Sequence, residues 1–147
     1  MQKVYLDTCC LNRPFDDQSQ VRVRLESEAI LHIIERCTSG ELRWVASNIL
    51  DFEIGQTQDA DRRERVHTLR SFADDTVTIT ASRLQRSQEI EALGISKLDA
   101  RHIACAEQAQ VDAFLTTDDR LLKLTNRFKS HFQIAIENPL TWISDKR

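Results

Sequence analysis

Short apolar runs alternate with longer amphipathic segments along this chain. Five runs are rich in branched or aromatic residues and bounded by polar ones, which is typical of strands. They cover Lys3–Asp7, Leu42–Ala46, Thr76–Thr80, Ala113–Thr116 and Phe132–Ile136. The segments between them fit helices, and the first of these repeats apolar residues four positions apart. The expected helices cover Val21–Cys37, Asn48–Gln56, Asp59–Ala73, Arg83–Leu93, Lys97–Gln110, Asp119–Phe128 and Leu140–Ile143.

Strands that alternate with helices predict an α/β fold with a parallel sheet covered on both faces. In such sheets, ligands bind outside the carboxyl ends of the strands. The chain has 147 residues, of which 41% are hydrophobic and 29% charged, with only three Gly and two Pro. This composition predicts a single domain over residues 1–147 without linkers. The sequence shows no membrane span and no export signal, so we expect a cytoplasmic protein.

Charge and cysteine content narrow the function only slightly. The net charge of −3 gives no support to a nucleic-acid binder and does not exclude one. The four cysteines contain no Cys-x-x-Cys pair, which argues against a zinc or thioredoxin-like site. We interpret all four as small buried residues.

Acidic residues recur where the strands end or the following helices begin. Asp7 ends the first strand, Glu53 lies early in the helix after the second, Asp99 lies in the first turn of its helix, and Asp118 follows the fourth strand. Each also has a structural explanation taken alone: an Asx-turn for Asp7, a solvated helix position for Glu53, and helix caps for Asp99 and Asp118. The coincidence of all four favours a shared site.

Gathered carboxylates repel one another unless a cation lies between them. Oxygen-only ligand sets suit Mg²⁺ or Mn²⁺, which polarise phosphates and activate water. The sequence therefore predicts metal-assisted phosphodiester hydrolysis.

The chain resembles the PIN-domain family of metal-dependent ribonucleases, which includes the VapC toxins of toxin–antitoxin pairs. The resemblance spans nearly the whole chain and rests on VYLDTCCL, VASNILDFEI, LDARHIACAEQAQVDAFLTTDDRLL and IAIENPLTWI. It implies a three-layer α/β/α domain with a central, mainly parallel five-stranded sheet, often a homodimer. It also implies Mg²⁺ or Mn²⁺, an RNA substrate, an antitoxin protein as partner, and an acidic quartet at Asp7, Glu53, Asp99 and Asp118.

Several neighbours of the quartet enter the same comparison. The resemblance suggests supporting hydroxyls at Thr116 or Thr117 and at Thr8. Asp118 keeps the Thr-x-Asp spacing, so we expect Asp119 to orient a water or cap the helix. Two positions depart from the family pattern: Cys9 replaces a common asparagine, and Gln110-Val111 replaces a glycine turn.

The positions of several other polar and aromatic residues suggest their roles. Arg13 and Lys97 are RNA-contact candidates because each lies within a few residues of a proposed metal ligand. We expect His102 on the helix surface or beside the site, and Trp44 and Trp142 in packing. The most basic segment is expected to be a solvated face with local ion pairs rather than a phosphate-binding surface. It contains Arg62, Arg63, Arg65, Arg70, Arg83 and Arg86.

The leading hypothesis is an endoribonuclease, plausibly the toxin of a type II toxin–antitoxin pair. The alternative is a catalytically inactive PIN-like binding or scaffold module. A phosphoacceptor domain is disfavoured. A dehalogenase-type phosphatase usually has a second Asp two residues after its nucleophilic Asp, and the residue two after Asp7 is Cys9.

Overall fold

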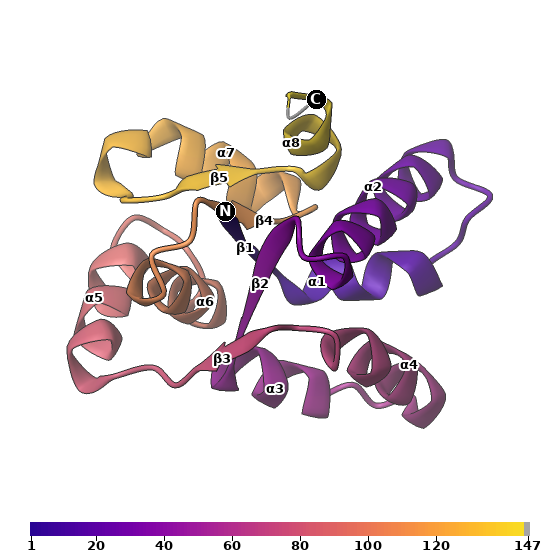
Figure 1. The fold of residues 1–147 in the computed structure, drawn as a ribbon. Helices are drawn as coiled ribbons and strands as arrows, with labels where there is room; N and C mark the ends of the chain where they lie inside the picture. The colour runs from indigo at the N-terminus through magenta and orange to yellow at the C-terminus, as the bar shows by residue number, and fades with distance from the viewer. Residues whose placement is uncertain (146–147) are drawn as a thin grey trace.

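A computed structural model of the chain describes residues 1–145, which contain one five-stranded sheet (Figure 1). Residues 146–147 of the expected domain lie outside the described residues. The strands are β1 (Gln2–Leu6), β2 (Leu42–Ser47), β3 (Asp75–Val77), β4 (Ala113–Leu115) and β5 (Ala135–Glu137). They lie in the order β3-β2-β1-β4-β5, and every pairing is parallel. The predicted α/β class and five-stranded sheet are confirmed.

Helices cover both faces of this sheet. In Figure 1, α5 and α6 lie on one side of the strands, while α1 and α2 lie on the other. The helices are α1 (Thr8–Asn12), α2 (Val21–Thr38), α3 (Asn48–Gly55), α4 (Ala60–Arg70), α5 (Ala81–Glu91), α6 (Lys97–Gln108), α7 (Asp119–Arg127) and α8 (Pro139–Asp145). Two 3₁₀ turns, η1 (Arg13–Phe15) and η2 (Lys129–His131), complete the elements.

Alternation along the buried strands divides the core into two layers. Val4 and Leu6 of β1 pack with residues of α2 and α8, including the buried Trp142. Tyr5, between them, points to the other layer and packs with Phe114 and residues of α5 and α6. This alternation follows from the two-residue period of a strand. Trp44 and Trp142 are both buried, which confirms their assignment to packing.

Two strands differ from the prediction for identifiable reasons. β3 ends at Val77 because side chains replace the ladder: Asn48 Oδ1 accepts from Ile79 N at 3.1 Å, and Gln108 binds the backbone of Thr78 and Thr80. β5 begins at Ala135 instead of Phe132, because Gln133 N donates to the side chain of Glu107 at 3.1 Å rather than to a neighbouring strand. The short helix α1, immediately after β1, was not predicted.

The turn before β4 contains the expected departure from glycine. Gln110 has φ of 55°, a left-handed conformation that is costly for residues with a Cβ. None of the helices within residues 1–145 has the length and apolar character needed to cross a bilayer.

Candidate functional site

Asp7 lies directly after β1, at the carboxyl end of a central strand. Its side chain is buried and accepts from the backbone N–H of Thr8 at 2.8 Å and from the hydroxyl of Thr116 at 2.9 Å. The thiol of Cys9 also points at this carboxylate, 3.6 Å from Oδ2. Burial raises the pKa of Asp7 above its usual value, and the nearby charge of Glu53 adds to this rise. Asp7 is therefore held firmly in a position that disfavours its charge.

Glu53 reaches the same place from α3. That helix is capped by Ser47, whose hydroxyl accepts from Leu50 N at 3.0 Å, so the end of β2 sets the position of Glu53. The carboxylate of Glu53 accepts from the Thr8 hydroxyl and lies 2.7 Å from Nε2 of His102. Burial acts to raise the pKa of Glu53, but the hydrogen bonds from His102 and Thr8 outweigh it and lower that pKa.

His102 connects Glu53 to the core. Its side chain is fully buried, and its Nδ1 lies 2.6 Å from the Tyr5 hydroxyl, which lies 2.6 Å from Ser47 Oγ. Burial acts to lower the pKa of His102, but the carboxylates of Glu53 and Asp7 outweigh it and raise that pKa. The part of the prediction that placed His102 beside the site is correct, and the surface alternative is wrong.

Asp99 and Asp118 line a pocket together beside this group. Asp99 lies in the first turn of α6, where Ser96 caps the helix by accepting from Asp99 N. Burial raises the pKa of Asp99 to about 6, with the charges of Asp7 and Asp118 contributing. Asp118 is exposed and caps α7, accepting from Arg120 N and Leu121 N at 3.0 and 3.2 Å. Asp118 therefore caps a helix and also lies at the site, whereas Ser96 rather than Asp99 caps α6.

The structure thus brings the four acids to one edge of the sheet, in two adjoining groups. Ligand atoms of Asp7, Glu53 and His102 all lie within 4.8 Å of one another. Asp99 and Asp118 form the second group, and the pKa of Asp99 responds to both Asp7 and Asp118. Sequence reasoning missed Tyr5 and the contact of Cys9 with Asp7. The position of His102, three residues after Asp99, was the available signal for its side of the helix.

Asp119 pairs with Arg22, and Asp118 rather than Asp119 caps α7, so only the water-orienting role of Asp119 stays a prediction. Its carboxylate accepts two hydrogen bonds from Arg22, each of 2.6 Å, and the exposed pair links α7 to α2. Thr117 makes backbone contacts on both sides: its N–H donates to Cys9 Sγ, and its carbonyl accepts from Arg22.

The two RNA-contact candidates have different surroundings. Arg13 forms ion pairs with Asp16 and with the buried Glu26. Lys97 is exposed at the start of α6. The expected local pairing of the basic segment is wrong for most of its members: only Arg65 (with Asp61) and, in part, Arg86 (with Glu89) pair within one helix. Arg62, Arg70, Arg83 and Arg86 bind carboxylates of other elements, and Arg63 donates to the carbonyl of Thr57.

The donor set suits a hard divalent cation. Carboxylate oxygens from Asp7, Glu53, Asp99 and Asp118 are the ligands that Mg²⁺ and Mn²⁺ prefer. Burial raises the pKa of both Asp7 and Asp99, so their charged forms are disfavoured without a cation. A bound cation would favour those charged forms.

A family model described as the PIN domain matches residues 4–126, which is most of the chain and includes all four acids. The chain belongs to the PIN-domain family. PIN domains are generally nucleases, and they typically use divalent metals.

Two solved structures share the fold of this PIN domain. FitAcB from Neisseria gonorrhoeae has 15% identity and a TM-score of 0.59, over 92% of this chain and 97% of that one. VapBC2 from Rickettsia felis, in a structure bound to a DNA fragment from its own promoter, has 13% identity and a TM-score of 0.60. The match covers 93% of this chain and 98% of that one. No curated protein matches the chain.

Proposed function

We propose that this PIN domain is a metal-dependent endoribonuclease and the toxin of a type II toxin–antitoxin pair. The observation that carries the proposal is the convergence of Asp7, Glu53, Asp99 and Asp118 at the carboxyl edge of the sheet, inside a family of nucleases. The FitAcB and VapBC2 complexes support a protein partner for this chain. A homodimer and a cytoplasmic location stay predictions from the sequence.

The four acids would hold Mg²⁺ or Mn²⁺. When bound, the metal would polarise the scissile phosphate and lower the pKa of an attacking water. The chain itself orients the ligands: Thr116 and the N–H of Thr8 fix the two oxygens of Asp7, and His102 fixes Glu53. Preorganised ligands need no rearrangement when the substrate arrives, which lowers the barrier to the reaction.

Replacement of single carboxylates tests the proposal. Asp7→Asn and Asp118→Asn each remove a ligand charge while keeping the side-chain shape. We expect each to lower Mn²⁺-dependent cleavage of single-stranded RNA by at least about a hundredfold. Cleavage of a labelled RNA is the measurement, with the circular dichroism melting curve as a check on folding.

Asp119→Asn is the matched control, because it removes a carboxylate one residue from Asp118 that is bound to Arg22. We expect it to cleave RNA within about threefold of wild type, since exposed ion pairs contribute little. Unchanged cleavage in a folded Asp7→Asn variant would overturn the mechanism and favour the scaffold alternative.

A further inference from the structure

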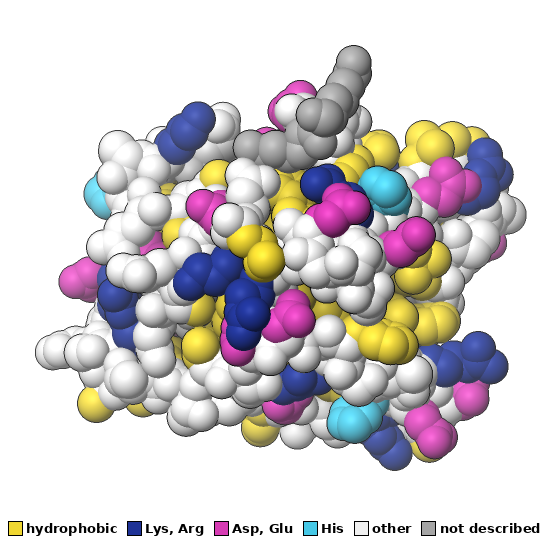
Figure 2. All heavy atoms as spheres, viewed as in Figure 1, with side chains coloured by type: hydrophobic (Ala, Val, Ile, Leu, Met, Phe, Trp, Pro, Cys, Tyr) yellow, Lys and Arg dark blue, Asp and Glu magenta, His cyan; other side chains and the backbone are white. Residues whose placement is uncertain are grey.

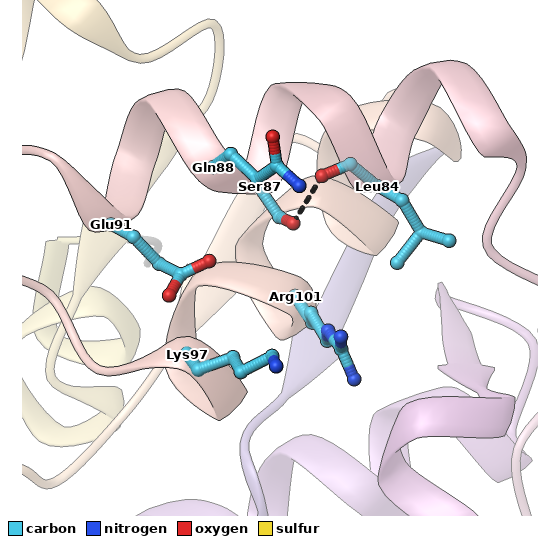
Figure 3. A pocket seen from close by; sticks show the side chains of 6 residues that line it. All are labelled: Leu84, Ser87, Gln88, Glu91, Lys97 and Arg101. Carbon is cyan, nitrogen blue, oxygen red and sulfur yellow. Dashed lines mark hydrogen bonds between the residues drawn. The ribbon is translucent and has the colours of Figure 1, made fainter.

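A second pocket lies between α5 and α6, next to the acidic site. Lys97 and Arg101 line it from α6, and Figure 3 shows both side chains extending to the same side of that helix. The residues that face them from α5 are Leu84, Ser87, Gln88 and Glu91. Glu91 also lines the pocket that contains Asp99 and Asp118, so the two pockets adjoin.

The two cations of this pocket lack the ion pairs that engage most arginines of the chain. Within the described residues, neither Lys97 nor Arg101 has a carboxylate within 4.0 Å, although Glu91 lines the same pocket. Arg101 Nε is buried without a hydrogen-bond partner. A buried donor without an acceptor is unfavourable, and an anion in the pocket would bring acceptor oxygens to this guanidinium group.

Stability does not explain this arrangement. Lys97 and Arg101 are four residues apart on one helix, where like charges repel. Lys97 also lies in the first turn of α6, and cations are unfavourable near the positive end of a helix. A local cost without a compensating contact is typical of functional positions.

The basic segment of α4 and α5 is not an alternative site for a polyanion. On the face drawn in Figure 2, basic and acidic side chains lie side by side. The arginines of α4 and α5 are occupied by carboxylates or carbonyls, as described above. The charges of Lys97 and Arg101 adjoin the acidic site, as does Arg120, which lines the pocket of Asp99 and Asp118.

We propose that Lys97 and Arg101 form a phosphate-binding subsite that holds the RNA strand next to the scissile phosphate. The inference rests on the proposed ribonuclease function. Asp99 lies two residues from each cation, so the subsite is across the first turns of α6 from the acidic group, about one helix diameter or ~10 Å away. Arg101 supplies a fork suited to two phosphate oxygens, and Lys97 adds a point charge.

RNA binding without metal isolates the subsite from catalysis. The probe is a short fluorescent single-stranded RNA in EDTA, and fluorescence anisotropy is measured at several salt concentrations. The test variant is Lys97→Gln/Arg101→Gln, which keeps most of each aliphatic stem. We expect its affinity to fall about tenfold at ~0.1 M salt, and the slope of log affinity against log salt to decrease by about 1.4, or 0.7 per lost contact.

The matched control is Lys123→Gln/Arg127→Gln, which removes the same two charges at the same spacing from α7. Its affinity is expected to stay within about twofold of wild type. The charge-retaining variant Lys97→Arg/Arg101→Lys should recover most of the binding. In Mn²⁺, the test variant should show a raised KM with kcat within about threefold of wild type. Thermal melting checks that each variant is folded.

The outcomes separate the two proposals. Equal losses in the test and control doubles, or unchanged binding in the test double, would overturn the subsite. Wild-type protein that binds RNA in EDTA but does not cleave it in Mn²⁺ would overturn the ribonuclease function, while the binding comparison would still decide the subsite. Wild-type protein that does not bind RNA would overturn the subsite directly.

Discussion

At the scale of single residues, the orientation of Glu53 depends on a buried polar chain. His102 contacts Glu53 with one ring nitrogen and Tyr5 with the other, and Tyr5 continues to Ser47. Ser47 also caps α3, the helix that carries Glu53. The position of Glu53 is thus set both by the start of its helix and by the contact at its carboxylate.

Substitution of His102 should separate orientation from stability. We expect His102→Ala to lower kcat by at least about tenfold, because Glu53 loses the hydrogen bond that fixes it. Tyr5→Phe should lower the free energy of unfolding by about 1–2 kcal/mol, since it leaves buried polar partners unsatisfied, but it should affect kcat much less. Steady-state cleavage and chemical denaturation measure both quantities. Equal kcat losses in the two variants would indicate general destabilisation rather than orientation.

The sequence was informative about acids and less so about their partners. Asp7 and Asp118 follow strands, and the rule that ligands bind at the carboxyl edge of parallel sheets predicts their location. His102 was ambiguous because its burial depends on Tyr5 and Glu53, which come from β1 and α3. The spacing of His102 from Asp99 indicates the side of the helix, but the local sequence does not show which distant segments cover it.

At the scale of elements, the turn between α6 and β4 stores local strain. Gln110 is exposed and left-handed, where a Cβ costs about 1–2 kcal/mol per residue. Its N–H donates to the carbonyl of Glu107, so the conformation belongs to the end of the helix. Glycine is the residue most often found at such helix ends.

Gln110→Gly is expected to raise the free energy of unfolding by up to about 1 kcal/mol. Glycine relieves the strain of the left-handed conformation. It also loses more conformational entropy on folding, and this cost offsets part of the gain in stability. Urea denaturation of the two proteins gives the difference. Gln110→Ala, which keeps the Cβ, should not be stabilised in the same way. A lower stability of the glycine variant would contradict this explanation of the turn.

Element boundaries were the less predictable part of the fold. The apolar run Thr76–Thr80 reads as a strand, yet Asn48 and Gln108 bind its backbone after Val77. The five residues of α1 are too short to show a helical period. By contrast, α2 is long and periodic, and its observed bounds of Val21–Thr38 differ from the prediction by one residue.

At the scale of the whole molecule, alternation of strands and helices predicted the parallel sheet and its layers. It did not predict the strand order, because the same alternation is compatible with several orders. The observed order places β1 and β4 side by side, with Val4 opposite Ala113 and Leu6 opposite Leu115. That pairing brings Asp7 next to Thr116 and assembles the site.

A divalent cation should stabilise the folded protein, because the assembled carboxylates exist only in that state. With free Mn²⁺ at 100 times its dissociation constant, the gain is about 2.7 kcal/mol, or roughly 5–10 °C in Tm for a chain of this size. Differential scanning fluorimetry with and without Mn²⁺ measures it. Asp7→Asn should lose most of the shift. An equal shift in both proteins would place the ion elsewhere, and no shift in wild type would favour the scaffold alternative.

The pairing of β1 with β4 also has a consequence for the timing of activity during synthesis. Asp7 leaves the ribosome early, but Thr116 and Asp118 emerge late, and β1 has only β2 as a neighbour until then. A nascent chain that ends before β4 therefore carries an incomplete set of acids. If the proposed ribonuclease function holds, the chain should therefore be unable to cleave RNA near its own ribosome until β4 and Asp118 have been made.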